Sequence, residues 1–280
     1  TGQKKEPLKI YADNKESYFE KEIVPISITP TGEKEKIHIG NVIVLRNITP
    51  FKELDFAKTS FIATVSHELK TPIASVKMSL QLLDNEKTGT LNTEQHQLLD
   101  GIKDDANRLL KITGELLNMT QVESGNIQLA LRPSDAKEII MYAIDANKMA
   151  AENKHIKLDF TYAENLPQVF TDSEKTAWVL NNLLSNAIRH SHENSTIYLR
   201  ITQQNKKIIF TVRDTGHGIA QEYKDKIFDR YFRVPGSQKE GTGLGLAISK
   251  EFIEAQGGTI QVESEIGSGS QFIVTLNAAE

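Results

Sequence analysis

Two neighbouring segments carry apolar residues at the spacing of a helix. In the first, apolar side chains recur at mostly three, four or seven positions, which is typical of a bundle helix; they are Leu54, Phe61, Val65, Leu69, Val76, Leu80 and Leu83. Pro72 lies inside this segment and predicts a kink. After the polar loop at 84–94, a second helix is expected, whose heptad seam is formed by Leu99, Ile102, Ala106, Leu109, Thr113, Leu116 and Thr120.

The apolar face of the second helix is wider than one partner helix can cover. Leu98, Leu110 and Leu117 lie beside the seam and extend it. Two antiparallel helices alone would leave much of this face in water. We therefore expect a homodimer, in which two helices from each chain form an antiparallel four-helix bundle.

The residues before the first helix read as strands. Residues 18–28 and 36–45 are rich in β-branched side chains and flank the turn sequence TPTGEK. About fifty residues are too few for a sheet domain with its own core. The segment ends on Asn47-Ile48-Thr49 and resembles the last strands of a PAS sensor domain, which commonly end in a D-I-T triplet; Asn47 stands where the Asp is usual. An unrelated β-hairpin is the other interpretation.

Beyond a Gly- and Pro-marked connector at 123–133, helical and strand patterns alternate. Helices are expected near 134–153, 173–191 and 244–256, and strands at 156–162, 196–202, 207–213, 259–264 and 271–276. This alternation predicts an α/β sandwich. The expected domains are therefore a PAS-like remnant at 1–49, a helical hairpin at 50–124 and an α/β domain at 132–280, which makes the chain a multidomain α and α/β protein.

Composition narrows the classes of chemistry. The 280 residues include no cysteine, which excludes disulfides and thiolate catalysis, and no HExxH zinc motif occurs. The net charge is -4, with acidic and basic residues interleaved, so no nucleic-acid partner is expected. No apolar run approaches the length of a membrane span, and the chain begins in mid-pattern, like a piece of a longer protein. A cytoplasmic location is expected, with membrane attachment only through regions outside this chain.

The first candidate for chemistry is His67. A helical residue turns about 100°, so His67 lies about 200° from Val65 and Leu69 and faces away from the apolar stripe. An exposed imidazole has a pKa near 6.5, so at neutral pH one ring nitrogen is free to act as a nucleophile. Glu68 is placed to accept the proton of the other nitrogen, and Thr71 follows one turn later. An ordinary surface histidine is the alternative.

Three further motifs follow in the chain. Asn182 and Asn186 are four residues apart on one helix face, and their carboxamide oxygens suit Mg²⁺. Asp214 ends a strand before a turn with two glycines, where a carboxylate can accept a hydrogen bond from an exocyclic amine. A third motif, GTGLG at 241–245, precedes a helix, so its backbone N–H groups can contact phosphates. It matches neither the dinucleotide-binding fingerprint nor the P-loop.

The order of these motifs is specific, although each alone is weak. Together they resemble the H, N, G1, F and G2 boxes of a sensor histidine kinase over residues 51–280. The resemblance implies that His67 is the phospho-acceptor, that Glu68 is the general base and that Thr71 supports phosphatase activity. It also implies a protein histidine kinase that uses ATP and Mg²⁺ and transfers the phosphoryl group to an aspartate in the receiver domain of a response regulator.

The family motifs also imply the nucleotide site. Asn182 and Asn186 would hold Mg²⁺, and Asp214 would read the adenine amino group. The full implied set is Asn182, Asn186, Arg189, His190, Asp214, Gly216, Gly218, Ile219, Phe228, Arg233, Gly241, Thr242, Gly243, Leu244, Gly245 and Leu246. Phe228 and Phe232 match the F box, and the polar segment between Gly218 and Gly241 resembles a lid. His190 stands where many relatives have Tyr or Phe, and imidazole can still stack on adenine.

Two other functions compete with a kinase. Gyrase-type ATPases resemble the same domain but carry a Glu four residues before the Mg²⁺-binding Asn, where this chain has Asn182, an amide that cannot activate water. Transfer to a side chain is therefore favoured over hydrolysis. A dimeric scaffold that uses ATP only as a conformational ligand is the second alternative.

Overall fold

The computed structural model describes residues 7–12, 15–29, 37–124, 127–236 and 241–279. The chain divides into two compact units, Thr1–Thr64 and Val65–Glu280, which are described separately. Within the described residues, none of the helices combines the length and the apolar character needed to cross a bilayer.

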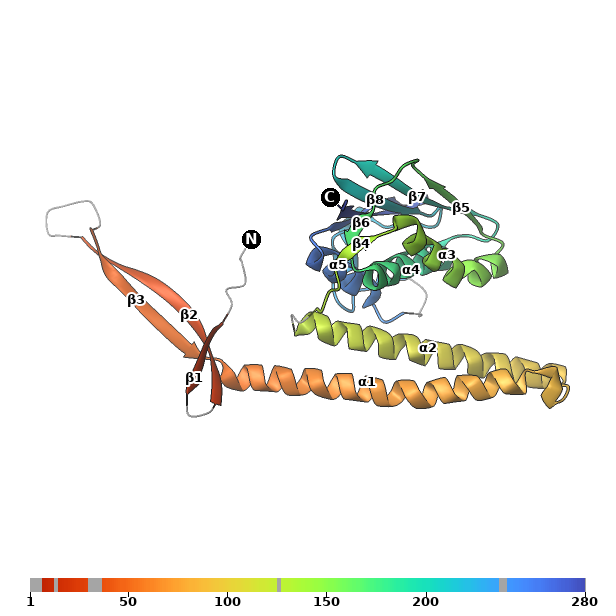
Figure 1. The fold of residues 1–280 in the computed structure, drawn as a ribbon, viewed down its shortest axis with the longest axis horizontal. Coiled ribbons are helices and arrows are strands. Elements are labelled where there is room, and N and C mark those ends of the chain that lie inside the picture. Colours follow the sequence, from red (N-terminus) through yellow and green to blue (C-terminus); the bar gives the residue numbers. More distant parts are fainter. Residues whose placement is uncertain (1–6, 13–14, 30–36, 125–126, 237–240, 280) are drawn as a thin grey trace. The chain divides into compact units, whose positions relative to one another are not determined.

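The first unit contains an antiparallel sheet, formed by β1 (Leu8–Ala12), β2 (Lys15–Ile28) and β3 (Ile37–Asn47) in that order (Figure 1). The two long strands were predicted and β1 was not. Most of the predicted turn TPTGEK lies outside the described residues. Apolar side chains of β2 and β3 such as Ile23 and Ile43 are exposed, whereas Tyr18 is buried. The PAS resemblance stays a prediction.

The triplet that ends β3 joins the sheet to the first helix, α1 (Thr49–Leu83). The Asn47 side-chain oxygen accepts a hydrogen bond from the Thr49 backbone N–H at 2.9 Å, and the Tyr18 backbone N–H donates to the Thr49 hydroxyl oxygen at 2.8 Å. An Asp carboxylate could accept the first bond equally well, so Asn47 preserves the local geometry.

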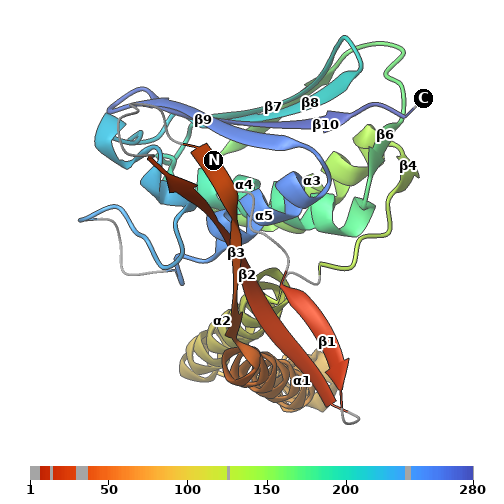
Figure 2. The same cartoon turned by 90° about the vertical axis from the view of Figure 1, so that its left-hand side faces the viewer.

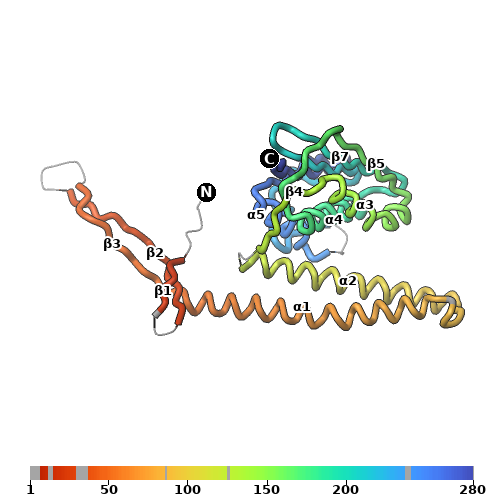
Figure 3. Tube along the Cα trace, viewed as in Figure 1, coloured from red at the N-terminus to blue at the C-terminus, as the bar shows by residue number. Residues whose placement is uncertain are grey.

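Two helices form the predicted hairpin. α1 continues past Pro72 as one helix, and after a short 3₁₀ turn, η1 (Glu86–Thr88), α2 (Thr93–Glu123) returns antiparallel to it (Figure 3). Asn92 caps α2 in a capping box with Gln95, since each side chain accepts a hydrogen bond from the other's backbone N–H. This explains why the helix begins at Thr93.

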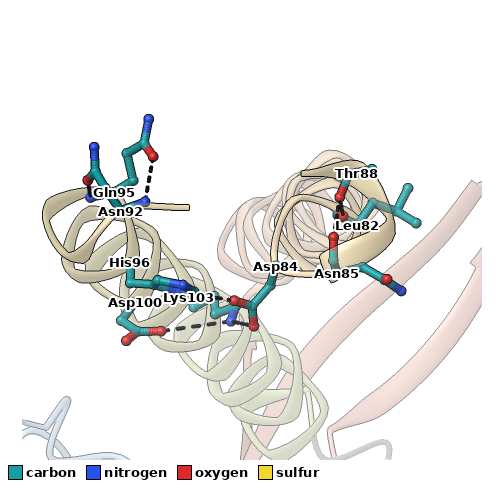
Figure 4. A network of polar contacts seen from close by, with 9 residues as sticks. All are labelled: Leu82, Asp84, Asn85, Thr88, Asn92, Gln95, His96, Asp100 and Lys103. Atoms are coloured by element: carbon teal, nitrogen blue, oxygen red, sulfur yellow. Dashed lines mark hydrogen bonds and ion pairs between the residues drawn. The ribbon is translucent and has the colours of Figure 1, made fainter. Parts of the chain in front are cut away.

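Charged side chains hold the turn of the hairpin. Figure 4 shows Asp84 at the end of α1 facing Lys103 of α2, with 2.6 Å between carboxylate and ammonium, and His96 Nδ1 lies 3.6 Å from the same carboxylate. Lys103 lowers the pKa of the Asp84 carboxyl, chiefly by hydrogen bonding. On the predicted seam, Leu99, Ala106 and Thr113 are buried, whereas Ile102 and Leu109 remain exposed; Leu98, beside the seam, is exposed as well.

The remaining elements form an α/β sandwich, as predicted. Its mixed sheet has the order β5-β7-β8-β10-β9, parallel between β5 and β7 and otherwise antiparallel. The strands are β5 (Lys157–Tyr162), β7 (Thr196–Gln204), β8 (Lys207–Arg213), β9 (Thr259–Glu265) and β10 (Gly269–Asn277). Three helices, α3 (Ala136–Asn153), α4 (Ser173–His190) and α5 (Gly245–Ala255), cover one face of this sheet (Figure 2).

The core lies between the sheet and the three helices. The central strands alternate buried and exposed positions, because successive side chains point to opposite faces. Fully buried side chains include Ile197, Leu199, Ile201, Ile208 and Phe210 from the strands and Ile140, Leu180, Leu183, Leu184, Ile248, Phe252 and Ile253 from the helices. This packing fixes the ends of α4 and α5, which carry the candidate site.

A small antiparallel ribbon, β4 (Arg132–Ser134) with β6 (Val169–Thr171), was not predicted. A buried polar network adjoins it. The Gln256 side-chain oxygen accepts hydrogen bonds from the Thr171 hydroxyl at 2.5 Å and from the Asp172 backbone N–H at 2.8 Å. The network thus ties the residue after α5 to the beginning of α4.

Candidate functional site

A pocket of about 450 Å³ gathers most of the motif residues. It is lined by residues of α2, α4 and β10, by the loop after β8, and by residues between 227 and 236 and between 241 and 246. Of the residues implied by the resemblance, it includes Asn182, Asn186, Arg189, His190, Asp214, Gly218, Ile219, Arg233, Gly241, Thr242, Gly243, Gly245 and Leu246. Residues up to 64 positions apart in the predicted set therefore share one cavity.

A larger open groove of about 1010 Å³ runs along β9 and β10. Its lining includes Phe228 but neither Asn182 nor Asn186, and none of the residues 241–245. The candidate site is accordingly the smaller pocket, where amide, carboxylate and glycine-loop groups converge.

The Asp214 carboxylate is buried at the end of β8 and held in one orientation. Its Oδ1 accepts hydrogen bonds from the backbone N–H groups of Gly216 at 2.9 Å and Ser270 at 3.2 Å. Burial raises the pKa of this carboxyl, and the two backbone hydrogen bonds oppose the rise. With Oδ1 engaged, Oδ2 is the oxygen that can accept a hydrogen bond from an amine on a ligand.

The loop after Asp214 needs glycine at Gly218. Its φ is +72°, and a Cβ there would lie 1.9 Å from the backbone oxygen of Glu265. Two hydrogen bonds hold the loop against the β9–β10 turn: Gly267 N–H to the His217 carbonyl at 2.8 Å and Ile219 N–H to Ser264 Oγ at 2.8 Å. The loop thus lies close against neighbouring backbone, and its residues Gly218 and Ile219 line the pocket.

The two asparagines on α4 lie on the same helix face, as predicted, but in different surroundings. Asn182 is buried, and its Nδ2 donates to Ser249 Oγ on α5 at 3.0 Å. Its Oδ1 lies 2.5 Å from where a Cβ on Gly245 would stand, so any larger residue at 245 would collide with it. Asn186 is half-buried on the pocket wall. Asn182 therefore connects α4 to the beginning of α5.

The C-terminal end of α4 brings basic groups to the pocket. Lys154 donates to the carbonyls of Ile188 and Arg189, each at 3.0 Å, and so satisfies two of the last carbonyls of the helix. His190 is exposed by area, but desolvation of its imidazole, then the nearby Arg189, lowers its pKa, which favours the neutral ring. A neutral ring is the form that stacks without a desolvation penalty for charge.

The two F-box phenylalanines take different positions. Phe232 lines the pocket and lies 5.9 Å, centroid to centroid, from Tyr223. Phe228 instead packs edge-on against Phe272, with 6.5 Å between ring centroids, and Lys250 lies over its outer face. Gly216 and Leu244 are buried next to the pocket and do not line it. Residues 237–240 of the predicted lid lie outside the described residues.

His67 lies on the exposed face of α1, as predicted. Its side chain is 79% exposed, and its Nδ1 lies 3.6 Å from the Glu68 carboxylate. Thr71 is exposed as well. His67, Glu68 and Thr71 are not among the described residues that line the pocket.

Among the pocket residues that sequence reasoning missed, two charged ones lie on α2. Lys111 and Glu115 line the cavity, and the Thr242 hydroxyl donates a hydrogen bond to the Glu115 carboxylate. Their heptad positions lie outside the seam, where charged residues are expected on any exposed helix face. A single chain offers no pattern that separates them from the other surface charges of α2.

Two family models match the chain in the order of the observed elements. Residues 57–125 match the "His Kinase A (phospho-acceptor) domain", and residues 171–280 match the "Histidine kinase-, DNA gyrase B-, and HSP90-like ATPase" family. The first match holds His67 and the second holds most of the pocket. The chain belongs to the sensor histidine kinases. Neither model reaches the N-terminal strands of this kinase.

Individual relatives agree with this assignment. The kinase is 29% identical over 257 residues to the alginate biosynthesis sensor protein KinB of Pseudomonas aeruginosa, covering 92% of this chain and 43% of KinB. It is 33% identical over 225 residues to the circadian input-output histidine kinase CikA of Synechococcus elongatus, covering 79% of this chain and 30% of CikA. The chain therefore spans less than half the length of these curated relatives.

Among solved structures, full-length ShkA in complex with AMPPNP is similar to this kinase. The TM-score is 0.64 at 26% sequence identity, and the match covers 79% of this chain and 46% of that one. The likeness extends over the hairpin and the α/β domain together, because neither alone accounts for that share of the chain.

Proposed function

We propose that this chain is the catalytic part of a sensor histidine kinase, which binds ATP in the pocket and transfers its γ-phosphoryl group to His67. The carrying observation is one pocket that holds a buried, oriented Asp214, the Asn186 carboxamide and the glycine loop, in a chain whose exposed His67 lies beside a carboxylate. The similarity to ShkA, solved with AMPPNP, supports a nucleotide as the ligand.

Each part of the nucleotide meets matching chemistry. The free oxygen of Asp214 accepts a hydrogen bond from the adenine amino group, and the flat loop at Gly218 lies against the ring. Backbone N–H groups of the loop at 241–245 and the N-terminal end of α5 bind the phosphates. Arg189 adds positive charge there, and the lid residue Arg233 contributes from the opposite wall.

The residues also fit Mg²⁺, which prefers a few protein oxygens together with phosphates and water. We assign the direct contact to Asn186, since the Asn182 amide is bonded to Ser249 and packed on Gly245. This narrows the sequence prediction, which gave both asparagines to the metal. The ion would neutralise charge on the β- and γ-phosphates during transfer.

The geometry at His67 indicates which nitrogen reacts. Because Nδ1 faces Glu68, that carboxylate can take the Nδ1 proton, and Nε2 keeps its lone pair for the γ-phosphorus. The new N–P bond forms as the bond to the bridging oxygen of ADP breaks. Since His67 does not line the pocket among the described residues, transfer requires that an α/β domain, of the same chain or of the partner chain, move toward His67.

The partners follow from the same family membership. The exposed seam residues Ile102 and Leu109, with Leu98 exposed beside them, support a homodimer through the hairpin. The phosphoryl group would then pass to an aspartate of a response-regulator receiver domain, and Thr71 would act in the reverse, phosphatase direction. Light scattering at micromolar concentration should give twice the chain mass.

Labelling with radioactive ATP tests the kinase. The chain should acquire an acid-labile label, which disappears in His67→Gln and persists in His96→Gln, a matched exposed histidine on α2. A label that persists in His67→Gln would contradict the assignment of the acceptor. Steady release of phosphate without labelling would favour an ATPase, and ATP binding without either would favour a scaffold.

A further inference from the structure

A carboxylate from α2 lies against the glycine loop that begins α5. Glu115 is buried, with a side chain only 5% exposed, and it accepts the hydrogen bond of the Thr242 hydroxyl. The Thr242 oxygen in turn accepts from the backbone N–H of Leu244 at 3.2 Å. The contact joins residues 127 positions apart, so it connects the hairpin to the nucleotide loop.

The surroundings of Glu115 are those of an anion site. Lys111 Nζ lies 4.0 Å from its Oε1, and an Arg189 nitrogen lies 3.2 Å from where a Cβ on Gly241 would stand. Burial, then Arg189, lowers the pKa of the Lys111 ammonium, and Glu115 opposes this shift. The positive end of the α5 dipole faces the same loop. Glu115 therefore shares this end of the pocket with Lys111, Arg189 and the N-terminal end of α5.

The phosphates of ATP need the same groups. A triphosphate that binds the loop at 241–245 would bring several negative charges next to the Glu115 carboxylate in a partly desolvated site, where like charges repel strongly. We propose that Glu115 occupies the phosphate end of the nucleotide pocket and is displaced when ATP binds, so that this hairpin residue sets the affinity of the pocket for nucleotide phosphates.

This inference rests on the ATP binding proposed above, and it has a reciprocal consequence. The coupling between two binding events is the same in both directions. If the contact of α2 with the α/β domain weakens ATP binding by some factor, ATP weakens that contact by the same factor. The release of α2 is a movement of the kind that brings the pocket to His67.

Two other polar contacts of α2 provide controls, because they lie outside the pocket. Gln121 Oε1 accepts from Lys175 Nζ at 3.0 Å, and Glu123 lies 3.5 Å from Arg230. None of these four is among the described pocket-lining residues. Loss of the Glu123 pair loosens the contact of α2 without removing charge from the pocket.

The first test compares nucleotide affinities of the whole chain by calorimetry. In Glu115→Gln, which keeps an oxygen for Thr242 and loses the charge, the dissociation constant for ATP should fall about tenfold. Its affinity for adenosine, which has no phosphate, should stay within about twofold of the parent. Glu123→Gln, which loosens α2 without removing charge from the pocket, should tighten ATP binding by less than about threefold. Circular dichroism confirms that each variant is folded.

Several results would overturn the inference. Unchanged or weaker ATP binding in Glu115→Gln would show that the carboxylate does not compete with phosphates. An equal increase in the affinities for ATP and adenosine would assign the effect to the contact of α2 in general rather than to the charge of Glu115. The same would follow if Glu123→Gln increased the affinity for ATP as much as Glu115→Gln does. If the parent chain bound no ATP, the proposed function itself would fall, which separates the two failures.

A second test needs no change at Glu115. The chain has no cysteine, so Gln121→Cys with Lys175→Cys introduces a unique thiol pair for a bifunctional maleimide. The crosslink holds α2 in contact with the α/β domain. ATP should bind the crosslinked protein at least about fivefold more weakly than the same protein with each thiol capped separately, and adenosine should bind both forms equally. Equal ATP affinity in the two forms would overturn the inference.

Discussion

Replacement of Gly218 by alanine should separate backbone strain from steric contact in the loop after Asp214. Gly218 and Gly267 both have positive φ, +72° and +81°, so alanine at either costs about 1–2 kcal/mol. Only Gly218 has a close neighbour: its Cβ would lie 1.9 Å from the Glu265 oxygen, whereas Gly267 has nothing within 4 Å. Gly267→Ala is therefore a matched control in the adjoining turn.

The difference between the two variants can be worked from the contacts. Relief of the clash at Gly218 moves the loop by about 1.5 Å from the Glu265 oxygen, to reach an ordinary contact distance. That shift breaks the hydrogen bonds of Gly267 to His217 and of Ile219 to Ser264, each worth about 1 kcal/mol. Gly218→Ala should lose about 3–4 kcal/mol in total, against about 1–2 for Gly267→Ala.

Thermal unfolding followed by circular dichroism measures the comparison. For a unit of this size 1 kcal/mol corresponds to about 2–4 °C, so the Tm should fall by roughly 6–16 °C in Gly218→Ala and by roughly 2–8 °C in Gly267→Ala. ATP affinity should fall in the first variant only, because Gly218 lines the pocket. Equal melting temperatures for the two variants would refute the argument from close contact.

Three further predictions concern other parts of the molecule. Burial raises the pKa of Asp214, and its ionised form accepts the hydrogen bond of the adenine amine. ATP affinity should therefore fall on acidification at a higher pH than it would for an ordinary aspartate of pKa 3.8. Calorimetry over a pH series measures this loss, which should be absent in Asp214→Asn because its affinity is low at every pH. Gln256→Ala leaves the buried Asp172 N–H without its acceptor and should lower the free energy of unfolding in urea by about 2 kcal/mol; an unchanged value would contradict the role of this bond. Gly101→Ala, on the open face of α2 with nothing within 4 Å, should raise the stability of the hairpin by about 0.5–1 kcal/mol, and a lower Tm would contradict the helix assignment there.

Periodicity predicted the elements whose length allows a pattern to repeat. The hairpin helices and the five-stranded sheet were predicted because each buries one face against a layer of apolar side chains. β4 and β6 are three residues long, and β4 contains Pro133, so neither shows an alternation that could have revealed it. β1 is also short, with five residues, and its pairing with β2 is set by tertiary contact.

The site divides along a similar line. Gly218 was predictable because a turn that needs a positive φ favours glycine in the sequence. Asp214 was predictable because a carboxylate at the end of a strand is a local pattern. The hydrogen bond of Asn182 to Ser249 depends on which helix packs beside α4, and a helical pattern gives the face but not the partner. Glu115 is the extreme case, since its burial depends on a contact 127 residues away.

The sheet order places β9 at an open edge, and its side chains determine what that edge can do. Gln261, Glu263 and Glu265 alternate along the exposed side of the strand. A second copy of the sheet that paired with this edge in antiparallel register would bring the Glu263 and Glu265 carboxylates close to their own copies, and like charges on facing strands are destabilising. The edge therefore resists the strand-to-strand joining that leads to fibres, and self-association is left to the helices.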